Sequence, residues 1–260
     1  MTEIVIQGIG GRMGHVLCDM IAQREDCCVV AGIDMKDGEQ NGIPVYDSLE
    51  KLNGKGDVII DFSSPAAVEK ALPYCQTHKL PIVVCTTGLS EELQLKVVQL
   101  SRSVPVFKSA NMSMGINVLA ELCKRASAVL GINYDIEIVE QHHHNKLDAP
   151  SGTAITLAEG ILEKIDRKDK WVKGTFLAPD GTISGTNDCA PNELPISSIR
   201  EGEVFGLHPI RYESDVDTIS ITHDAKNRRG FALGAVLAAE YTAKHEGALG
   251  MSDLFPFLKD

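Results

Sequence analysis

The first third of the chain alternates short apolar runs with segments in which apolar side chains recur at helical spacing. Helical spacing covers residues 12–23, and Pro65 and Ser90 open two further segments of this kind. The apolar runs lie at residues 4–6, 27–33, 58–60, 81–85 and 104–107. Strands that are apolar on both faces and alternate with helices are typical of a parallel sheet covered on both sides. We therefore expect an α/β domain in this part of the chain.

The hydrophobic pattern changes after about residue 113. A long apolar-periodic segment, 114–130, leads into residues 134–140, where apolar and polar positions alternate as in a strand with one solvated face. The other elements expected are helices at 153–165 and 230–246 and strands at 197–200, 203–208 and 216–222. This order predicts an α+β domain inserted into the first, so that residues 1–113 and 224–260 form one domain and residues 114–223 the other.

Glycines follow the first predicted strand at once. Residues 8–14 are Gly-Ile-Gly-Gly-Arg-Met-Gly, and Asp34 ends the next strand. Glycine permits a tight turn and a close approach of the backbone to a pyrophosphate, while the helix N-terminus supplies N–H donors. A carboxylate at position 34 can accept hydrogen bonds from an adenosine ribose. This context predicts a Rossmann-like dinucleotide site, and a structural turn without a ligand is the alternative.

Side chains near the glycines bear on the choice between NADH and NADPH. Asp34 would repel a 2′-phosphate and therefore favours NADH, and Met35 offers no cation. Lys36 and Arg12 could partly neutralise a phosphate, so NADPH use stays open. The expected cofactor is NADH, NADPH or both, with NADH favoured.

Polar segments also follow the later predicted strands of the first domain. Residues 85–88 are Cys-Thr-Thr-Gly, and residues 109–112 are Ser-Ala-Asn-Met. Because ligands in such folds lie beyond the carboxyl ends of the strands, these segments could offer backbone groups and hydroxyls to a nicotinamide. Ordinary turns between strand and helix are the alternative. Asp61 and Ser63 end the third strand in the same way, without a definite role.

The most informative segment begins with three consecutive histidines at 142–144. Histidine is the side chain most easily poised as a general acid near neutral pH, and Lys146 can pair with a carboxylate. Ser151 can cap the following helix, whose first N–H groups at Gly152 and Thr153 can hold an anion. These residues predict a site for a small dianionic substrate. One alternative is a polar surface loop. Another is a zinc site, which is disfavoured because neighbours on a strand point to opposite faces and no Cys lies near.

Composition narrows the classes of function. The formal charge is −11, with 25 Lys and Arg against 36 Asp and Glu, which argues against nucleic acid as a partner because phosphate contacts need a clustered basic surface. No pair among the seven Cys has C-x-x-C spacing and most lie in apolar runs, so we expect a reducing, cytoplasmic compartment. No apolar stretch approaches the roughly 20 residues that span a bilayer, so no membrane is expected as a partner.

Together, these motifs resemble the dihydrodipicolinate reductase family over nearly the whole chain. The resemblance rests on residues 8–14, on Thr-Thr-Gly at 86–88 and on Ala-Asn-Met-Ser-x-Gly-x-Asn at 110–117. Its most specific part is Glu-x-His-His-x-x-Lys-x-Asp-Ala-Pro-Ser-Gly-Thr-Ala at 140–154. Further matches are Arg200-Glu-Gly, Gly206-Leu-His208 and Thr222-His223.

The resemblance implies an NAD(P)H-dependent reduction of 4-hydroxy-tetrahydrodipicolinate or dihydrodipicolinate to tetrahydrodipicolinate, a step of the diaminopimelate route to lysine. It also implies a homotetramer with an N-terminal dinucleotide domain and a C-terminal domain for substrate binding and oligomerisation. His142 resembles the family's proton donor, and Lys146 resembles its catalytic partner. The implied substrate contacts are His143, Lys146, Ser151, Gly152 and Thr153. The implied cofactor contacts are Gly8, Ile9, Gly10, Gly11, Arg12, Met13, Asp34, Cys85, Thr86, Thr87, Ser109, Ala110, Asn111 and Met112.

Two positions depart from the family pattern. Cys85 stands where many relatives have Gly, which bears on the turn geometry, and Met35 stands where some have Arg, which bears on NADPH use. Two other functions stay open, namely another two-domain NAD(P)-dependent dehydrogenase and a protein that binds NAD(H) without turnover. The segment from His142 to Thr153 favours the reductase over the other dehydrogenases, which share the glycine turn, whereas an assay of NADH oxidation with dihydrodipicolinate would separate it from the protein without turnover.

Overall fold

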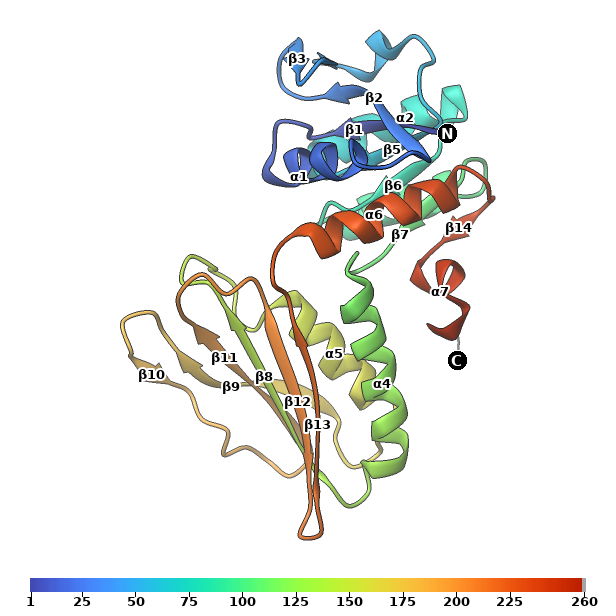
Figure 1. The fold of residues 1–260 in the computed structure, drawn as a ribbon. Helices are drawn as coiled ribbons and strands as arrows, with labels where there is room; N and C mark the ends of the chain where they lie inside the picture. Colours follow the sequence, from blue (N-terminus) through green and yellow to red (C-terminus); the bar gives the residue numbers. More distant parts are fainter. Residues whose placement is uncertain (259–260) are drawn as a thin grey trace. The chain divides into compact units, whose positions relative to one another are not determined.

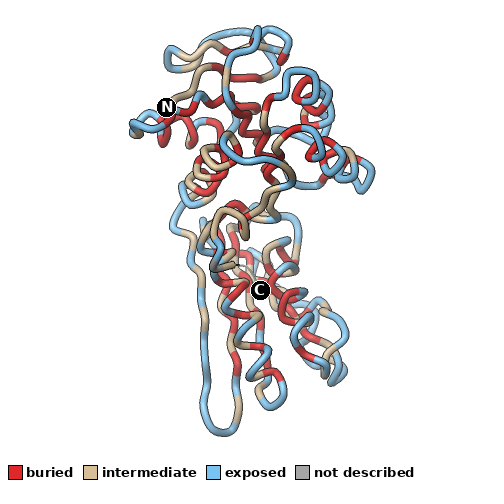
Figure 2. The backbone as a smooth tube through the Cα atoms, turned by 90° about the vertical axis from the view of Figure 1, so that its right-hand side faces the viewer, coloured by how far each residue is buried: buried red, intermediate tan, exposed pale blue. Residues whose placement is uncertain are grey.

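The computed structural model describes residues 1–258 and divides into two compact units (Figure 1). Unit 1 contains Met1–Met114 and the chain from Arg228 onward, and unit 2 contains Gly115–Asn227. Figure 2 shows buried residues concentrated inside each unit. The functional roles that we assign to the two units stay predictions.

Unit 1 is built around an eight-stranded sheet with the order β14-β7-β6-β5-β1-β2-β4-β3. The strands are β1 (Thr2–Gln7), β2 (Cys27–Ile33), β3 (Gly38–Gln40), β4 (Ile43–Tyr46), β5 (Val58–Asp61), β6 (Ile82–Val84), β7 (Val106–Lys108) and β14 (Ala248–Leu249). All pairings are parallel except that of β3 with β4. The helical segments are α1 (Arg12–Ile21), η1 (Leu49–Leu52), α2 (Pro65–His78), α3 (Glu91–Leu100), α6 (Arg229–Thr242), α7 (Met251–Leu254) and η2 (Pro256–Leu258).

Alternate residues of the central strands enter two separate cores. Ile4 and Ile6 of β1 pack in one cluster with residues of α1 and α6, whereas Val5 packs in the other with residues of α2 and α3. A strand with both faces buried needs apolar residues at successive positions, which explains the continuous apolar runs. This arrangement confirms the predicted α/β, Rossmann-like fold of the unit.

The strand order places a topological switch at β1. The chain passes from β1 to β2 on one side and later returns to β5 on the other. Because these strands are parallel, their carboxyl ends lie along one edge of the sheet, and in such folds ligands bind at this point. The glycine turn and the segments after β5, β6 and β7 all follow these carboxyl ends.

Unit 2 has a six-stranded mixed sheet with the order β10-β9-β11-β8-β12-β13. Its elements are α4 (Met114–Leu130), β8 (Asp135–His142), α5 (Gly152–Leu162), β9 (Lys170–Leu177), β10 (Ile183–Ser184), β11 (Glu193–Arg200), β12 (Leu207–Glu213) and β13 (Thr218–Asp224). Helices α4 and α5 lie on the same face (Figure 1), since Cys123 and Leu157 share one core cluster with Ile138 of β8. The opposite face carries half-exposed side chains such as Val139 and Ile199.

Some expected elements differ from those observed. The strand predicted at 203–208 is wrong, because β12 runs from Leu207 to Glu213 and the positive φ angles of Gly202 and Gly206 belong to the preceding turn. Pro209 lies inside β12, where it is opposite Thr222 of β13 and the pairing with β8 skips positions 208 and 209. Strands β3, β4, β9, β10 and β14 were not predicted. Four of them have only two to four residues, too few to show a periodicity, and β9 lacks a clear alternation of buried and exposed residues.

Candidate active site

The turn between β1 and α1 requires glycine for steric reasons. Gly8 has a φ of +85°, and a Cβ there would lie 2.4 Å from the carbonyl oxygen of Phe62. A Cβ on Gly14 would lie 2.1 Å from the carbonyl oxygen of Ile9, so only glycine allows α1 to pack this closely against the turn. No side chain caps the helix at Gly11, and its first turn holds no acidic residue. The turn therefore fits a pyrophosphate, because it leaves the positive end of a helix open to an anion.

Asp34 is fixed against the same turn. Its Oδ2 accepts a hydrogen bond from the Gly10 N–H at 2.7 Å, and its Oδ1 accepts one from the Met35 N–H at 2.8 Å. A carboxylate has about four lone-pair sites, so acceptor capacity remains for the hydroxyls of a ribose. The Met35 side chain is 90% exposed and provides no positive charge beside Asp34. The structure thus places the Asp34 carboxylate against the glycine turn, and the assignment of both to a dinucleotide stays a prediction.

The segments after β6 and β7 are held by local hydrogen bonds. Thr86 Oγ1 accepts the Ser63 N–H at 2.9 Å, which ties the segment after β6 to the segment after β5. Ser109 Oγ donates to the Asn111 carbonyl at 2.8 Å. Cys85 is buried, and burial raises the pKa of its thiol well above the ordinary range, so it stays protonated. These segments can offer neutral polar groups to a ligand, and Cys85 is unsuited to nucleophilic chemistry.

A buried carboxylate underlies this edge of the sheet. Asp61, the last residue of β5, is fully buried and accepts a hydrogen bond from the Ser63 hydroxyl. Ser63 Oγ in turn accepts the amide of Gln7 at 3.3 Å. Burial raises the pKa of Asp61 to about 6, although hydrogen bonds from Ser63 and Thr86 oppose the shift.

Asp61 should make the stability of the protein depend on pH. Its pKa is about 6 in the folded state and 3.8 in a free chain, so the folded state binds the proton more tightly. The free energy of unfolding should therefore fall by about 3 kcal/mol as the pH rises from about 4 to about 6, and then level off. We expect Asp61→Asn to remove this slope in urea unfolding measured across that range. If the free energy of unfolding depends on pH in the same way in the wild type and in Asp61→Asn, Asp61 is not the group responsible.

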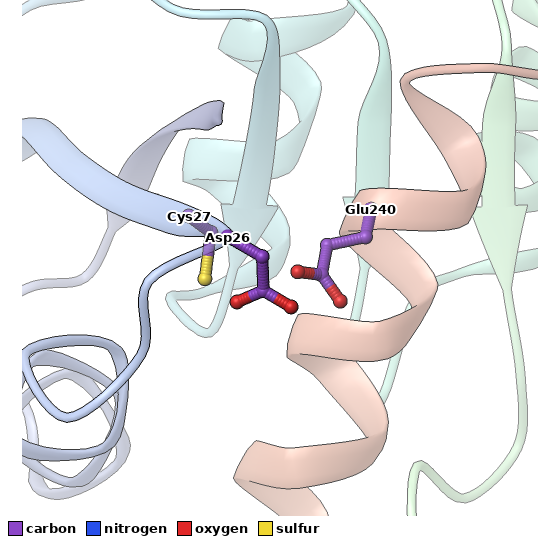
Figure 3. A group of neighbouring side chains, drawn as sticks. All are labelled: Asp26, Cys27 and Glu240. Carbon is purple, nitrogen blue, oxygen red and sulfur yellow. The ribbon is translucent and has the colours of Figure 1, made fainter.

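One cluster of potential metal ligands lies elsewhere in unit 1. Asp26, Cys27 and Glu240 place their ligand atoms within 4.8 Å of one another (Figure 3). The Arg24 guanidinium, however, lies 2.5 Å from the Asp26 carboxylate and 3.0 Å from that of Glu240. Burial raises the pKa of Cys27 to about 11, so its thiol is protonated at neutral pH. We interpret this cluster as an ion pair that joins α6 to the start of β2.

In unit 2, a buried carboxylate joins the residues around His142. Glu140 and His142 lie two residues apart on β8 and point to the same buried side of the sheet. Glu140 Oε2 lies 2.5 Å from His142 Nδ1, and Oε1 accepts the Ser151 N–H at 3.1 Å. Burial alone would raise the pKa of Glu140, but hydrogen bonds from His142 and Arg200 lower it to about 2. Glu140 is therefore a carboxylate at neutral pH.

The side chain of Arg200 completes this buried cluster. It donates to both oxygens of Glu140, from Nη1 at 3.0 Å and from Nη2 at 2.8 Å. It also donates to the backbone carbonyls of Lys146 and Asp148. A bidentate pair of this kind fixes both side chains more strictly than a single hydrogen bond does.

A second buried histidine packs beside His142. The rings of His142 and His208 form an edge-to-face pair with centroids 5.2 Å apart. Burial, followed by the neighbouring His142, lowers the pKa of His208 to about 3, so His208 is neutral. Its Nε2 lies 3.4 Å from the Ser151 hydroxyl. His208 is thus an uncharged residue that contacts both the candidate general acid and Ser151 at the start of α5.

The remaining predicted substrate residues lie on the segment between β8 and α5 and on the first turn of α5. Ser151 caps α5 by accepting the Ala154 N–H at 3.2 Å, as predicted. Gly152 is exposed and Thr153 is half-buried in the first turn. Lys146 is half-buried, and its ammonium lies 2.8 Å from both carboxylate oxygens of Asp148.

The three consecutive histidines have different surroundings. His142 is buried against Glu140, His143 is half-buried, and His144 is exposed with Nδ1 2.8 Å from the Gly202 carbonyl oxygen. Among the described residues they do not belong to any group of three clustered metal ligands. The geometry therefore favours the acid–base interpretation of this segment over the zinc interpretation.

Three residues of this site were not given a role from the sequence. Glu140, Arg200 and His208 belong to the quoted motifs, and the alternation of each strand could have indicated their burial. Ile136 and Ile138 point into the core, so Glu140 and His142 at the same spacing must also point inward. A carboxylate at a core position of a strand requires a charged or hydrogen-bonding partner, and this requirement is the signal that sequence reasoning did not use.

Comparison with known proteins covers both units. Family models described as "Dihydrodipicolinate reductase, N-terminus" and "Dihydrodipicolinate reductase, C-terminus" match residues 2–112 and 115–255. Curated 4-hydroxy-tetrahydrodipicolinate reductases of Clostridium novyi and Caldanaerobacter subterraneus are each 38% identical to this chain, over 98% of both sequences. A solved dipicolinate-bound dihydrodipicolinate reductase from Paenisporosarcina sp. TG-14 superposes with a TM-score of 0.80 at 25% identity, covering 96% of this chain and 97% of that one.

Proposed function

This chain belongs to the dihydrodipicolinate reductase family, and from that premise we propose that it reduces 4-hydroxy-tetrahydrodipicolinate, or its dehydrated form, to tetrahydrodipicolinate. It is an NAD(P)H-dependent oxidoreductase, and the reaction is a step of lysine biosynthesis through diaminopimelate. The observation that carries the proposal in this chain is the buried Glu140–His142 pair beside the N-terminus of α5. Besides a hydride donor, reduction of a cyclic dicarboxylate needs a proton donor and groups that hold the carboxylates, and His142 and the helix end can serve as these.

We assign the proton donor to His142. Glu140 holds Nδ1, so Nε2 is the nitrogen that remains to deliver a proton. A Cβ on Gly206 would come within 3.2 Å of Nε2, so the absence of a side chain at this position keeps the nitrogen accessible. His142 would protonate the ring carbon next to the one that receives the hydride.

The substrate carboxylates are assigned to the segment that follows β8. His143 and Lys146 would supply positive charge or hydrogen bonds, and Ser151, Gly152 and Thr153 would supply the donors of the helix end. The Paenisporosarcina enzyme is described as dipicolinate-bound, which supports a small dicarboxylate as the ligand. In the described structure Lys146 is paired with Asp148, so binding of a carboxylate would compete with this ion pair.

Unit 1 is assigned to the dinucleotide, which supplies the hydride when bound. Residues from Gly8 to Met13 would hold the pyrophosphate, and Asp34 would accept the ribose hydroxyls. The nicotinamide contacts would come from Cys85, Thr86, Thr87, Ser109, Ala110, Asn111 and Met112. The open N-terminus of α1 and the fixed carboxylate of Asp34 support this assignment.

The function is tested by following NADH oxidation with freshly made dihydrodipicolinate. We expect turnover with this substrate and none with oxaloacetate or a simple aldehyde. Turnover of an amino acid or an aldehyde instead would favour another two-domain dehydrogenase. Tight NADH binding without turnover of any of these would favour a sensing protein and would overturn the proposal.

We expect Asp34 to favour NADH over NADPH. Asp34→Ala should lower the ratio of kcat/KM for NADH to that for NADPH by about tenfold, because the ribose acceptor and the charge that repels a 2′-phosphate are both lost. Asp37→Ala is the matched control, since Asp37 is an exposed carboxylate on the same segment that bonds to Lys51. An unchanged ratio in Asp34→Ala, or an equal change in both variants, would contradict the assignment.

We also propose that the protein is a homotetramer that associates through the open face of the unit 2 sheet. This face carries half-exposed apolar residues: Val139, Pro195, Ile199, Leu207 and Pro209. Light scattering should give the mass of four 28.1 kDa chains for the wild type and a lower mass for Ile199→Glu. Val129→Glu changes an exposed apolar residue of α4 and should leave the mass unchanged. Monomeric wild-type protein would contradict the proposal.

The compartment that we propose is the reducing cytoplasm. All seven cysteines are free thiols in the structure, and none is paired. No helix of the described chain has the length and apolar character needed to cross a membrane.

A further inference from the structure

Glu140 and Arg200 form a buried ion pair in unit 2. The Glu140 side chain is fully buried, and that of Arg200 is 1% exposed. They come from neighbouring strands, since the parallel pairing of β11 with β8 sets Arg200 opposite His142 and Ser198 opposite Glu140. Replacing buried ion pairs with apolar residues is often neutral or stabilising, so such a pair is weak evidence for a contribution to stability. Its contacts indicate a different role.

Four contacts of the pair end on the proposed active site or the segment beside it, whereas the bond from Arg200 to the Ile199 carbonyl and its contact with the Phe176 ring lie outside it. Glu140 contacts His142 Nδ1 and the Ser151 N–H. Arg200 donates to the carbonyl of Lys146 at 3.3 Å and to that of Asp148 at 2.5 Å. One buried pair therefore connects the general acid, the N-cap of α5 and the backbone on both sides of residue 147.

We propose that Glu140 and Arg200 form a positioning pair for the reaction, in which Glu140 fixes the ring and tautomer of His142 and Arg200 fixes Glu140 and the backbone of residues 146–148. The inference rests on the proposed function, and neither residue touches substrate or cofactor in it. Glu140 acts through His142, because a carboxylate that accepts Nδ1–H leaves Nε2 for proton delivery and stabilises the protonated ring. Arg200 acts through Glu140, because its bidentate bonds leave the carboxylate one orientation.

Charged and titratable groups surround the pair on every element that packs against it. His142 and Glu140 belong to β8, and Arg200 belongs to β11. The neutral His208 on β12 faces His142, and His223 lies opposite His208 on β13. Lys146 and Asp148 lie on the segment that Arg200 holds. Glu140 bonds to Arg200 and His142, so neutralising it changes the charge felt by the general acid directly.

The first test compares two substitutions on the same strand. Glu140→Gln should lower kcat by at least about tenfold and move the alkaline limb of the kcat–pH profile to lower pH, while the KM values for substrate and NADH change by less than about threefold. Glu137→Gln is the matched control, because Glu137 is an exposed carboxylate on β8 that lies 3.9 Å from the Arg211 guanidinium. A merely structural role would not move the pH profile. Full kcat with an unchanged profile in Glu140→Gln would overturn the proposal.

A double-mutant comparison tests whether Glu140 acts through His142. Adding Glu140→Gln to His142→Ala should lower kcat no further than His142→Ala alone. Losses of kcat that multiply in the double variant would overturn the proposal.

Imidazole nitrogen NMR of the wild type and Glu140→Gln adds a readout that needs no turnover. The His142 tautomer should change in the variant while His144 keeps its signal. If the NMR change appears but the wild type has no reductase activity, the proposed function fails and the positioning role survives.

Glu140→Gln leaves the buried charge of Arg200 uncompensated and can therefore fold poorly. Two conservative variants test the proposal in that case. Glu140→Asp retains the charge and Arg200→Lys retains the positive charge but loses the bidentate geometry. Arg200→Lys should lower kcat by about tenfold and also raise the substrate KM, because residues 146–148 lose their donor. Wild-type kinetics in Arg200→Lys would overturn the part of the proposal that concerns Arg200.

Discussion

Replacing His142 with alanine is expected to lower kcat by at least about a hundredfold, since a positioned general acid contributes about 10²–10⁴ in rate. His142 is buried on β8, its Nδ1 is held by Glu140 at 2.5 Å, and His208 packs against its ring. No other described histidine combines burial with a carboxylate partner on the same strand face. The variant should still bind NADH with the affinity of the wild type, which fluorescence titration of the bound dinucleotide would measure.

The adjacent His144 provides the control for this prediction. His144→Ala also removes an imidazole from the segment, but His144 is exposed and its ring nitrogen lies beside the Gly202 carbonyl. We expect its kcat within about threefold of the wild type. A loss of kcat below about tenfold in His142→Ala, equivalent to about 1.4 kcal/mol, would remove His142 from the role of proton donor. Equal losses in both variants would indicate a general disturbance of the segment.

The fold of unit 1 could be predicted because each of its central strands has a distinct pattern. In β1, Ile4 and Ile6 enter one core and Val5 enters the other, so the run is apolar at every position. Runs of this kind occur where helices cover both faces of a sheet. The edge strand β3 and its neighbour β4 are short and lie partly in solvent, so periodicity does not distinguish them from loops.

The residues assigned to substrate contact could also be proposed from the sequence, because they lie close together along the chain. Ser151 was predicted to cap α5, as it does. Asp34 was predicted to accept hydrogen bonds from a ribose beside the glycine turn, and the structure shows it bonded to the Gly10 N–H of that turn. The partnership of Glu140 with Arg200 was out of reach, since the two residues are 60 positions apart and meet only through the register of β8 with β11. The presence of Pro209 inside β12 could not be predicted either, because it depends on the register of β12 with β8, which skips this position.

The features that could be predicted and those that could not differ in the range of the interactions that determine them. Local signals such as caps, glycine turns and periodicity depend on interactions within a few residues, and the sequence displays them directly. Partners on different strands depend on pairing register, which the packing of the entire sheet determines. A buried charge such as Glu140 indicates that a partner exists, and the structure identifies it as Arg200.

Replacing Lys146 with alanine should affect both binding and turnover. Its ammonium is half-buried and bonded to Asp148, a partner that a substrate carboxylate can replace at small cost because both states contain an ion pair. A positive charge beside the substrate also stabilises the negative charge that develops as hydride arrives. We therefore expect the substrate KM to rise by about tenfold and kcat to fall by about tenfold, with the KM for NADH unchanged.

Lys124 offers a matched control for this substitution. Its side chain is 28% exposed, against 22% for Lys146, and it forms a single ion pair with Glu163 at 3.0 Å. Lys124→Ala removes the same charge from a similarly half-buried position on α4, so its steady-state kinetics should match those of the wild type. If Lys146→Ala changes neither constant, the ammonium does not meet the substrate, and the carboxylates must be held by the end of α5 alone. If only the substrate KM changes, Lys146 binds the substrate in its ground state and contributes nothing specific to the transition state.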